Sequence, residues 1–141
     1  MRVSTVEKGK SIFEKAGKEI SKRILMVDDN KSIRDTVADF LVSLEYEVAL
    51  AVDGIEALAV FLDKSFDLVL TDFEMPAMDG YILAGHIKEN SPGTPVILIT
   101  GADRGTVLKM VEAGPVDSII FKPFMLDDLQ TSVQRALAFR C

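Results

Sequence analysis

Residues 66–80 read FDLVLTDFEMPAMDG, and this stretch decides how the rest of the chain is interpreted. Leu68 to Asp72 are apolar except for Thr71, so the pattern predicts a buried strand that ends on a carboxylate. Pro76 and Gly80 soon interrupt the chain, which places Asp72 at the start of a loop. A buried strand that delivers an acid to a loop often presents a reactive group in α/β folds. The ordinary alternative is a strand-ending Asp that accepts hydrogen bonds in a turn.

The same alternation of strand and helix patterns extends in both directions from this stretch. Short apolar runs predict strands at residues 24–27, 46–52, 66–71, 95–100 and 118–121. Each run precedes apolar residues at helical spacing, which are Ile33, Val37, Phe40, Leu41 and Leu44; Ile55, Leu58, Ala59 and Leu62; Tyr81, Leu83, Ala84 and Ile87; Val107, Leu108 and Val111; and Leu126, Leu129, Val133 and Leu137. Five such β–α units predict an α/β fold with a doubly wound, five-stranded parallel sheet that helices cover on both faces.

The carboxyl ends of the predicted strands carry a distinct set of polar residues. Asp28 and Asp29 follow the first strand, Asp72 ends the third, Thr100 ends the fourth, and Lys122 follows the fifth. In a parallel sheet these ends lie at one edge, so we expect three carboxylates, one hydroxyl and one ammonium group to converge. Each residue alone has an ordinary explanation, as a helix N-cap, a turn residue or a solvated lysine. Coincidence at four of the five strand ends is a poorer explanation than a shared site.

The chemistry of this set predicts a metal-assisted phosphoryl site. Crowded carboxylates raise one another's pKa, so positive charge must compensate. Lys122 supplies one charge, and a hard cation that prefers oxygen ligands, Mg²⁺ or Mn²⁺, would supply the rest. Such a cation keeps open coordination positions, which leaves room for a phosphoryl group. Asp72 is then the expected nucleophile that forms an aspartyl phosphate, while Lys122 and the Thr100 hydroxyl bind phosphoryl oxygens.

Composition and charge narrow the function further. The 141 residues suffice for one domain and carry a net charge of −6, divided into +4 over residues 1–23 and −10 over the remainder. The acidic body argues against nucleic-acid binding, because phosphate neutralisation needs clustered Lys and Arg. The single cysteine, Cys141, excludes an intrachain disulfide, and no apolar run is long enough for a membrane helix. We therefore expect a cytoplasmic protein that makes no membrane contact.

Four motifs together resemble the receiver domain of two-component response regulators, in the manner of the single-domain chemotaxis regulators. These motifs are VDDN at 27–30, TDFEMPAMDG at 71–80, ITG at 99–101 and FKPF at 121–124. The resemblance covers about residues 21–140 and implies a (βα)5 flavodoxin-like fold with strand order 2-1-3-4-5. It also implies a cis bond between Lys122 and Pro123.

The resemblance implies specific roles for the residues at the strand ends. Asp72 would accept a phosphoryl group from a sensor histidine kinase or a histidine phosphotransfer protein. Asp29, Asp72 and the Glu74 backbone carbonyl would bind Mg²⁺ or Mn²⁺ directly, and Asp28 would act largely through water. Thr100 would be the switch hydroxyl and Lys122 the lysine that binds the phosphoryl group.

The sequence also departs from the usual receiver pattern. Ile119 stands three residues before Lys122, where receivers usually carry Tyr or Phe, and Met125 stands where an Asp or Ser usually caps the last helix. Ile82 is expected as an exposed apolar residue on the third helix. His86, the only histidine, is expected on a solvent face rather than in a phosphorelay.

The expected organisation is a basic N-terminal extension over residues 1–22 and a receiver domain over 23–141. The extension is predicted to be a tail or a short helix, because Ile12, Phe13, Ala16 and Ile20 have helical spacing but Gly9 and Gly17 weaken it. The predicted function is a phosphorylation-dependent switch rather than a turnover enzyme. It would act on a downstream protein target as a monomer, or as a weak dimer through the fourth helix, fifth strand and fifth helix.

Other readings place the same pattern in different functional classes. The chain could be a receiver-like interaction module, but a degenerate receiver of that kind would lack Asp72 or Lys122, and both are present. It could also be a receiver fragment of a larger response regulator or hybrid kinase. A flavodoxin-like cofactor binder needs a phosphate-cradling loop after the first strand. Asp28 and Asp29 would repel that phosphate, so this class is excluded.

Overall fold

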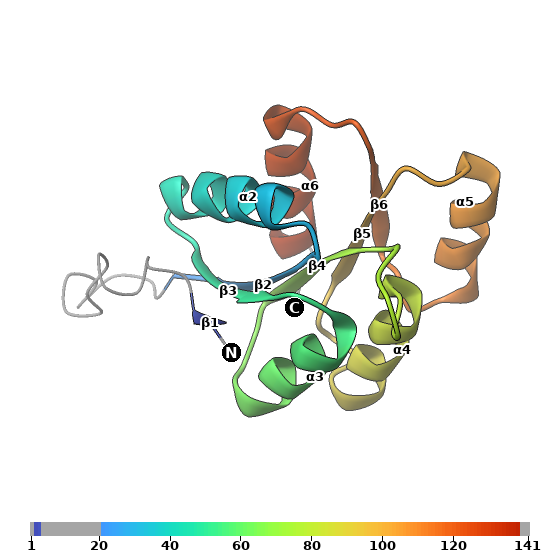
Figure 1. Ribbon diagram of the computed structural model, residues 1–141, viewed down its shortest axis with the longest axis horizontal. Helices are drawn as coiled ribbons and strands as arrows, with labels where there is room; N and C mark the ends of the chain where they lie inside the picture. Colours follow the sequence, from blue (N-terminus) through green and yellow to red (C-terminus); the bar gives the residue numbers. More distant parts are fainter. Residues whose placement is uncertain (1, 4–20, 139–141) are drawn as a thin grey trace.

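The computed structural model describes residues 2–3 and 21–138, which form one sheet with helices on both faces (Figure 1). The strands are β1 (Arg2–Val3), β2 (Arg23–Val27), β3 (Glu47–Ala51), β4 (Leu68–Asp72), β5 (Val96–Thr100) and β6 (Ser118–Phe121). The helices are α2 (Lys31–Ser43), α3 (Gly54–Asp63), α4 (Gly80–Asn90), α5 (Arg104–Ala113) and α6 (Leu126–Ala138).

The sheet has the predicted topology. Its strand order is β1-β3-β2-β4-β5-β6, and β3, β2, β4, β5 and β6 are parallel to one another. These five strands follow the order 2-1-3-4-5, so the flavodoxin-like prediction is confirmed. Helices α2 and α6 cover one face, and α3, α4 and α5 cover the other (Figure 1). The carboxyl ends of all five parallel strands therefore lie at one edge.

An additional strand lies at the outer edge of β3. Arg2 and Val3 form β1, which pairs antiparallel with β3 through Leu50 and Ala49. Without β1, the outer edge of β3 would present unpaired backbone groups, which readily accept another strand. Sequence analysis predicted a tail or short helix here and did not anticipate this strand. The predicted helical pattern over Ile12–Ile20 lies outside the described residues.

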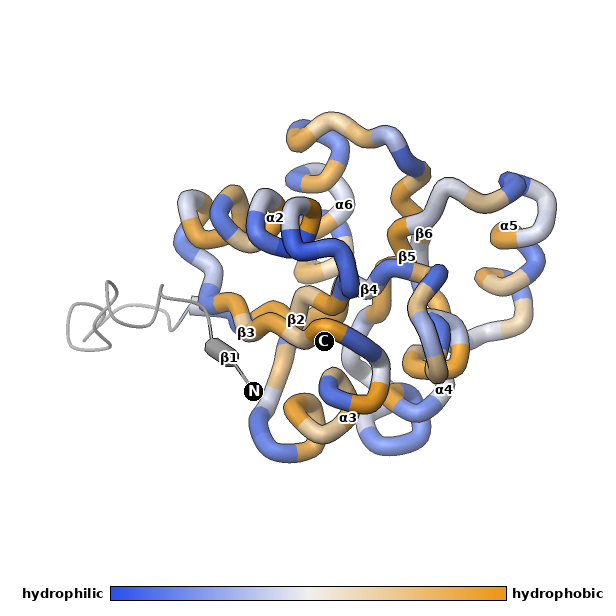
Figure 2. Tube along the Cα trace, in the orientation of Figure 1, coloured by the Kyte–Doolittle hydropathy of each residue, from blue (hydrophilic) through white to orange (hydrophobic). Residues whose placement is uncertain are grey.

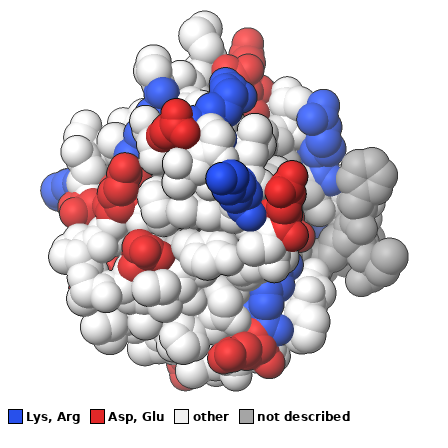
Figure 3. Space-filling view, turned by 90° about the vertical axis from the view of Figure 1, so that its right-hand side faces the viewer, with Lys and Arg blue, Asp and Glu red and all other residues white. Residues whose placement is uncertain are grey.

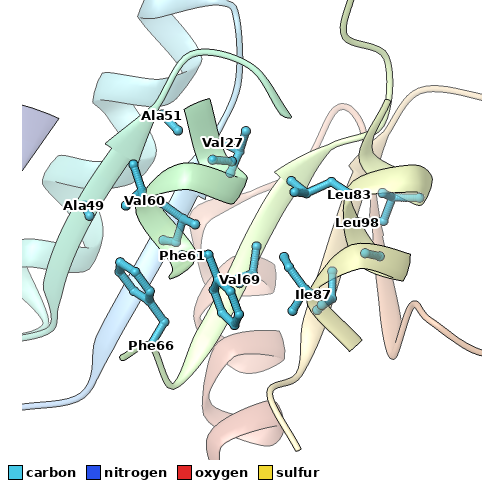
Figure 4. Close-up of a cluster of buried hydrophobic side chains, with 14 of the residues drawn as sticks. Val27, Ala49, Ala51, Val60, Phe61, Phe66, Val69, Leu83, Ile87 and Leu98 are labelled. Carbon is cyan, nitrogen blue, oxygen red and sulfur yellow. The ribbon is translucent and has the colours of Figure 1, made fainter. Parts of the chain in front are cut away.

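Two apolar layers hold the helices on the sheet. Successive strand residues point to opposite faces, so each central strand contributes to both layers. The layer under α3, α4 and α5 includes Val27, Ala49, Val69, Leu83, Ile87 and Leu98 (Figure 4). The layer under α2 and α6 includes Ile24, Met26, Leu41, Leu70, Ile99 and Leu129. Full burial of one such side chain stabilises the fold by roughly 1.5–3 kcal/mol. Because both faces of the sheet are covered, the strands are apolar along most of their length (Figure 2).

Polar caps fix where most helices begin. The side chains of Asn30, Asp53, Asp79 and Asp103 each accept a hydrogen bond from the backbone amide three residues later. These contacts satisfy amides that the first helical turn leaves without partners. Helix α6 begins differently, because Met125 precedes it and its amide donates to the Asp128 carboxylate at 3.4 Å. The capped helix starts lie beside the loops at the carboxyl edge of the sheet.

The predicted buried face of α3 is wrong. Ile55 and Leu62 are 60% and 58% exposed, while Ala57, Val60 and Phe61 are buried. The helix is apolar on nearly all sides, so its periodicity could not select one face. The face that packs includes Phe61, whose ring lies 6.0 Å from that of Phe66.

The surface is mixed in charge on the side that lies at the right of Figure 1. Acidic and basic side chains are interspersed there rather than gathered by sign (Figure 3). Among the helices formed by the described residues, none combines the length and apolar character that crossing a membrane would require.

Candidate functional site

Three carboxylates meet at the carboxyl edge of the sheet. Strand β2 pairs with β4 so that Val27 lies opposite Thr71, and the next residues are Asp28 and Asp72. The register of two neighbouring strands therefore brings these two acids together. Asp29 joins them, and the three residues offer oxygen atoms that all lie within 4.8 Å of one another. The convergence expected from the strand ends is confirmed for this group.

Asp28 is the most deeply buried acid of the cluster, with a relative exposure of 0%. Its Oδ1 accepts a hydrogen bond from the Asn30 amide at 2.9 Å, but its Oδ2 is buried without a partner among the described residues. Burial, with smaller contributions from the negative charges of Asp72 and Asp29, raises the pKa of Asp28 to about 6 despite the Asn30 hydrogen bond. An orphaned buried oxygen beside two further carboxylates is the donor set that a hard divalent cation needs. The residues present therefore fit the expected metal.

Asp72 ends β4 and contacts Lys122. The Lys122 Nζ donates to Asp72 Oδ1 at 2.8 Å, and the Asp72 side chain is only 5% exposed. Burial raises the pKa of Asp72, although the hydrogen bond and positive charge of Lys122 oppose the rise. Burial alone lowers the pKa of Lys122, but its contacts with the acids outweigh burial and the pKa rises. Lys122 therefore stays charged and is the nearest counter-ion of the cluster.

Thr100 ends β5 and is fully buried next to this pair. Its neighbour Ile99 lies opposite Asp72 in the sheet, which brings the threonine to the same edge. The Thr100 Oγ1 accepts a hydrogen bond from the Ala102 amide at 2.9 Å, and its carbonyl accepts from the Lys122 amide at 2.8 Å. The hydroxyl thus holds a turn and makes no hydrogen bond with Asp72 or Lys122.

The loop after β4 carries Glu74 and closes tightly on Asp72. Glu74 is exposed, and its negative charge raises the pKa of Asp72 slightly. The Gly80 amide donates to the Phe73 carbonyl at 2.9 Å, which brings the start of α4 against the end of β4. A Cβ at Gly80 would lie 2.3 Å from the Asp72 carbonyl oxygen, so only glycine fits there. Helix α4 consequently begins in direct contact with the backbone of Asp72.

The loop after β6 has the predicted cis bond between Lys122 and Pro123. Phe121, the residue before Lys122, packs under the Arg104 guanidinium, whose central carbon lies 4.0 Å from the ring centroid. This cation–π contact joins the first residue of α5 to the end of β6.

Other residues singled out from the sequence lie away from the cluster. Ile82 is 47% exposed on α4, as expected. The His86 side chain is 42% exposed and lies 3.5 Å from Glu89, so it is on the surface, as predicted. Ile119 is partly buried and packs against the layer under α3, α4 and α5.

Arg34, which is only 6% exposed, was not singled out from the sequence. Its Nη1 donates to the Asp28 carbonyl at 2.7 Å. The signal was present in the sequence, because Arg34 precedes Val37, Ala38 and Leu41 at the spacing of a buried helix face.

Comparisons with known proteins agree with this geometry. The family described as response regulator receiver domain matches residues 24–134. The chain is 39% identical over 116 residues to the transcriptional regulatory protein ZraR of Salmonella typhimurium. This match covers 82% of this chain and 26% of that protein. It is also 39% identical over 111 residues to the sensor histidine kinase RcsC of Salmonella typhi, with 78% of this chain and 12% of that protein covered. The chain thus spans about a quarter or less of these relatives.

Solved structures give the same result at the level of the fold. The chemotaxis protein CheY4 of Vibrio cholerae superposes with a TM-score of 0.80 at 32% identity, covering 84% of this chain and 100% of that one. The receiver domain of NtrX from Brucella abortus has a TM-score of 0.77 at 35% identity, with 82% and 98% covered. The family match, these structural neighbours and the acidic cluster at the strand ends agree: the chain belongs to the receiver domain family of two-component response regulators.

Proposed function

We propose that this receiver domain is switched by phosphorylation of Asp72, with a sensor histidine kinase or a histidine phosphotransfer protein as donor. The observation that carries the proposal is the environment of Asp72. It is a nearly buried carboxylate 2.8 Å from Lys122 and grouped with Asp28 and Asp29. A structural ion pair has no need of two further acids beside it, whereas a phosphoryl-transfer site does.

The chemistry assigned to these residues is a displacement at phosphorus. A carboxylate oxygen of Asp72 forms a bond to phosphorus as the bond from phosphorus to the donor nitrogen breaks, and the electron pair leaves with the donor imidazole. Lys122, now paired with Asp72, would bind one phosphoryl oxygen, and the Thr100 hydroxyl would turn from Ala102 to donate to another. Asp72 must be ionised to attack, and the charge of Lys122 favours that form.

The proposed metal ligands are Asp29, Asp72 and the Glu74 carbonyl, with Asp28 acting largely through water. When bound, Mg²⁺ or Mn²⁺ would neutralise charge that develops on the phosphoryl oxygens. The unpartnered Asp28 Oδ2 supports this assignment, because buried carboxylate oxygens are rarely left without a partner. The phosphorylated acid is consumed as an acceptor and restored only by slow hydrolysis, so the domain is a switch rather than a turnover enzyme.

The donor protein is proposed to cover an apolar groove beside Lys122. This groove has a volume of about 530 Å³ and is lined by Ser32, Ile33, Thr36, Val37, Lys122, Pro123, Phe124 and Leu126. A donor histidine must reach Asp72 from the open edge of the sheet, and this groove borders that edge. The proposed location of the domain is the cytoplasm, since the single cysteine, Cys141, suits a reducing compartment. Its output would be a downstream protein, bound by a monomer or by a weak dimer through α5, β6 and α6.

Residues 1–22 are proposed to be an extension of a receiver domain that would occupy residues 23–141, and Arg2 and Val3 of this extension add the edge strand β1 to the sheet of the domain. The charge difference between these parts supports the boundary, since the extension is basic and the body acidic. Deletion of residues 1–22 should leave Asp72 phosphorylation intact, and loss of labelling would place the extension inside the domain.

Acetyl phosphate with Mg²⁺ tests the central proposal directly. Intact-mass measurement should show one added phosphoryl group in the wild-type protein and none in Asp72→Asn. Asp127→Asn is the matched control, because Asp127 is exposed on α6 and is not one of the three clustered acids. Equal labelling of Asp72→Asn and wild type would refute the assignment of the acceptor.

A further inference from the structure

Arg34 is the only Lys or Arg among the buried residues of the described chain. Taking a charged side chain out of water costs several kcal/mol unless the charge is paired or well hydrogen-bonded. None of the ion pairs found among residues 21–138 includes Arg34. Its burial therefore needs another explanation.

The guanidinium is directed at the backbone of the acidic cluster. Its Nη1 donates to the Asp28 carbonyl at 2.7 Å, a short hydrogen bond of the charge-assisted kind. Its Nε is buried and has no hydrogen-bond partner within the described residues. The buried charge is thus directed at one carbonyl, which belongs to the residue that begins the cluster.

That carbonyl lies in a turn whose other groups are also held in place. The Asp28 amide donates to the Ala51 carbonyl at 3.2 Å, and the Asn30 amide donates to Asp28 Oδ1 at 2.9 Å. The Arg34 amide donates to the Asn30 carbonyl at 2.9 Å. By contrast, no hydrogen bond among the described residues holds the exposed Asp29 side chain. The position of Asp29 therefore depends on the backbone of this turn, and Arg34 contacts that backbone at the Asp28 carbonyl.

We propose that Arg34 is a positioning residue for the divalent-cation site, and this inference rests on the proposed function. By holding the Asp28 carbonyl, Arg34 keeps the turn in the conformation that faces Asp28 and Asp29 toward Asp72. Residues that orient metal ligands typically contribute 10–100-fold to metal affinity. A role for the charge alone predicts the opposite sign, because removing a nearby positive charge would strengthen cation binding.

Mg²⁺ affinity measured by calorimetry separates these two roles. Arg34→Met keeps much of the apolar stem and removes the donor, so we expect affinity to fall by about 10-fold or more. Arg34→Lys keeps a charged donor without the planar fork, and its affinity should be intermediate. Arg23→Met is the matched control. Arg23 lies on β2, the strand that leads to Asp28, and is partly buried, but it pairs with Glu47 and should leave Mg²⁺ affinity unchanged.

A second measurement needs no metal. Hydrogen exchange of the Asn30 amide, followed by NMR in the metal-free protein, should accelerate in Arg34→Met and remain unchanged in Arg23→Met. Unchanged or tighter Mg²⁺ binding in Arg34→Met, or unchanged Asn30 exchange, would overturn the positioning role. If Arg34→Met does not fold, Arg34→Lys decides by the same criteria. If the wild type binds no Mg²⁺, the proposed function fails, while Asn30 exchange still decides whether Arg34 clamps the turn.

Discussion

The amino and carboxyl ends of the parallel sheet differ in how they accommodate acidic side chains. At the amino ends, Glu47 accepts from Arg23 Nε at 3.3 Å, and Asp117 accepts from Lys88 Nζ at 2.6 Å. Asp117 also accepts from the Val96 amide at 2.7 Å. Each of these acids has a basic partner and helps to hold the strands in register.

At the carboxyl ends, three acids share one lysine. Asp28 has an unpartnered buried oxygen, the Asp29 side chain makes no hydrogen bond within the described chain, and among the three acids only Asp72 hydrogen-bonds to Lys122. The same fold thus uses carboxylates for stability at one end and tolerates destabilising carboxylates at the other. Such a local cost is typical of sites whose stabilising partner is a ligand.

Neutralising Asp28 should give the largest change in stability. Its pKa is higher in the folded state, about 6 against 3.8, so the folded protein binds the proton more tightly. The associated stability is fully present below about pH 4 and is lost as the pH rises through about 6. The difference corresponds to about 3 kcal/mol at neutral pH. Chelator-treated Asp28→Asn should therefore be more stable than wild type at pH 7 by up to about that amount.

Urea unfolding at pH 5 and pH 7 checks this expectation. Wild type should become less stable as the pH rises between these values, and the Asp28→Asn variant should lose most of that dependence. A variant that is less stable than wild type at pH 7 would show that the cluster is not strained.

Removing an acid at the amino ends of the strands should lower the stability of the protein, which is the opposite of the effect expected for Asp28→Asn. Asp117→Ala leaves the Val96 amide without its acceptor and Lys88 without its partner. We expect a loss of about 1–3 kcal/mol in the free energy of unfolding, mainly from the unpaired amide. Denaturant titration at pH 7 measures it. If Asp117→Ala and Asp28→Asn shift stability in the same direction, the contrast between the two ends is wrong.

Mg²⁺ should stabilise the acids at the carboxyl ends of the strands, as basic side chains stabilise the acids at the amino ends. A cation present at ten times its dissociation constant stabilises the folded state by about 1.4 kcal/mol and raises the melting temperature. Asp29→Ala should reduce this response, because it removes a proposed ligand. Thermal melts with and without millimolar Mg²⁺ give the result, with Asp127→Asn as the surface control. A wild-type melting temperature that does not change when Mg²⁺ is added would count against the proposed metal site.

The smallest effect is expected at Ile119. This side chain is smaller than the usual aromatic ring and stiff at χ1, so its movement transmits little free energy. Ile119→Ala should change phosphorylation-dependent partner binding or self-association by less than about 1 kcal/mol, which is below the usual coupling range. Thr100→Ala should remove most of the coupling and leave Asp72 able to be labelled. Titration with and without beryllofluoride, against a partner or by sedimentation, compares the two. A large loss for Ile119→Ala with little loss for Thr100→Ala would reverse this ranking.

The parallel strands and their polar ends could be predicted from sequence because geometry leaves little freedom. Each apolar run ends where a polar residue follows, and a parallel sheet puts those ends at one edge. Asp72 and Lys122 are 50 residues apart, yet their convergence needed only the strand assignments.

Features that depend on packing could not be predicted in this way. The buried face of α3 was missed because both Phe61 and Leu62 fit an apolar stripe, and only tertiary contacts distinguish them. Arg34 was missed because a charged residue is assumed to be exposed. Strand β1 was missed because two residues carry no periodic pattern, and its pairing depends on the edge that β3 offers.

Gly80 has a mechanical consequence. Helix α4 abuts the carbonyl of the acceptor residue with no side chain between them, so it behaves as a fixed stop behind Asp72. The segment from Thr100 to α5 has more freedom to move, because the contacts that hold it are a hydrogen bond from Ala102 to Thr100 and the stack of Arg104 on Phe121 rather than tight backbone packing. Phosphorylation of Asp72 should therefore displace α5 rather than α4. The tight contact at Gly80 would thus determine which helix moves when Asp72 is phosphorylated.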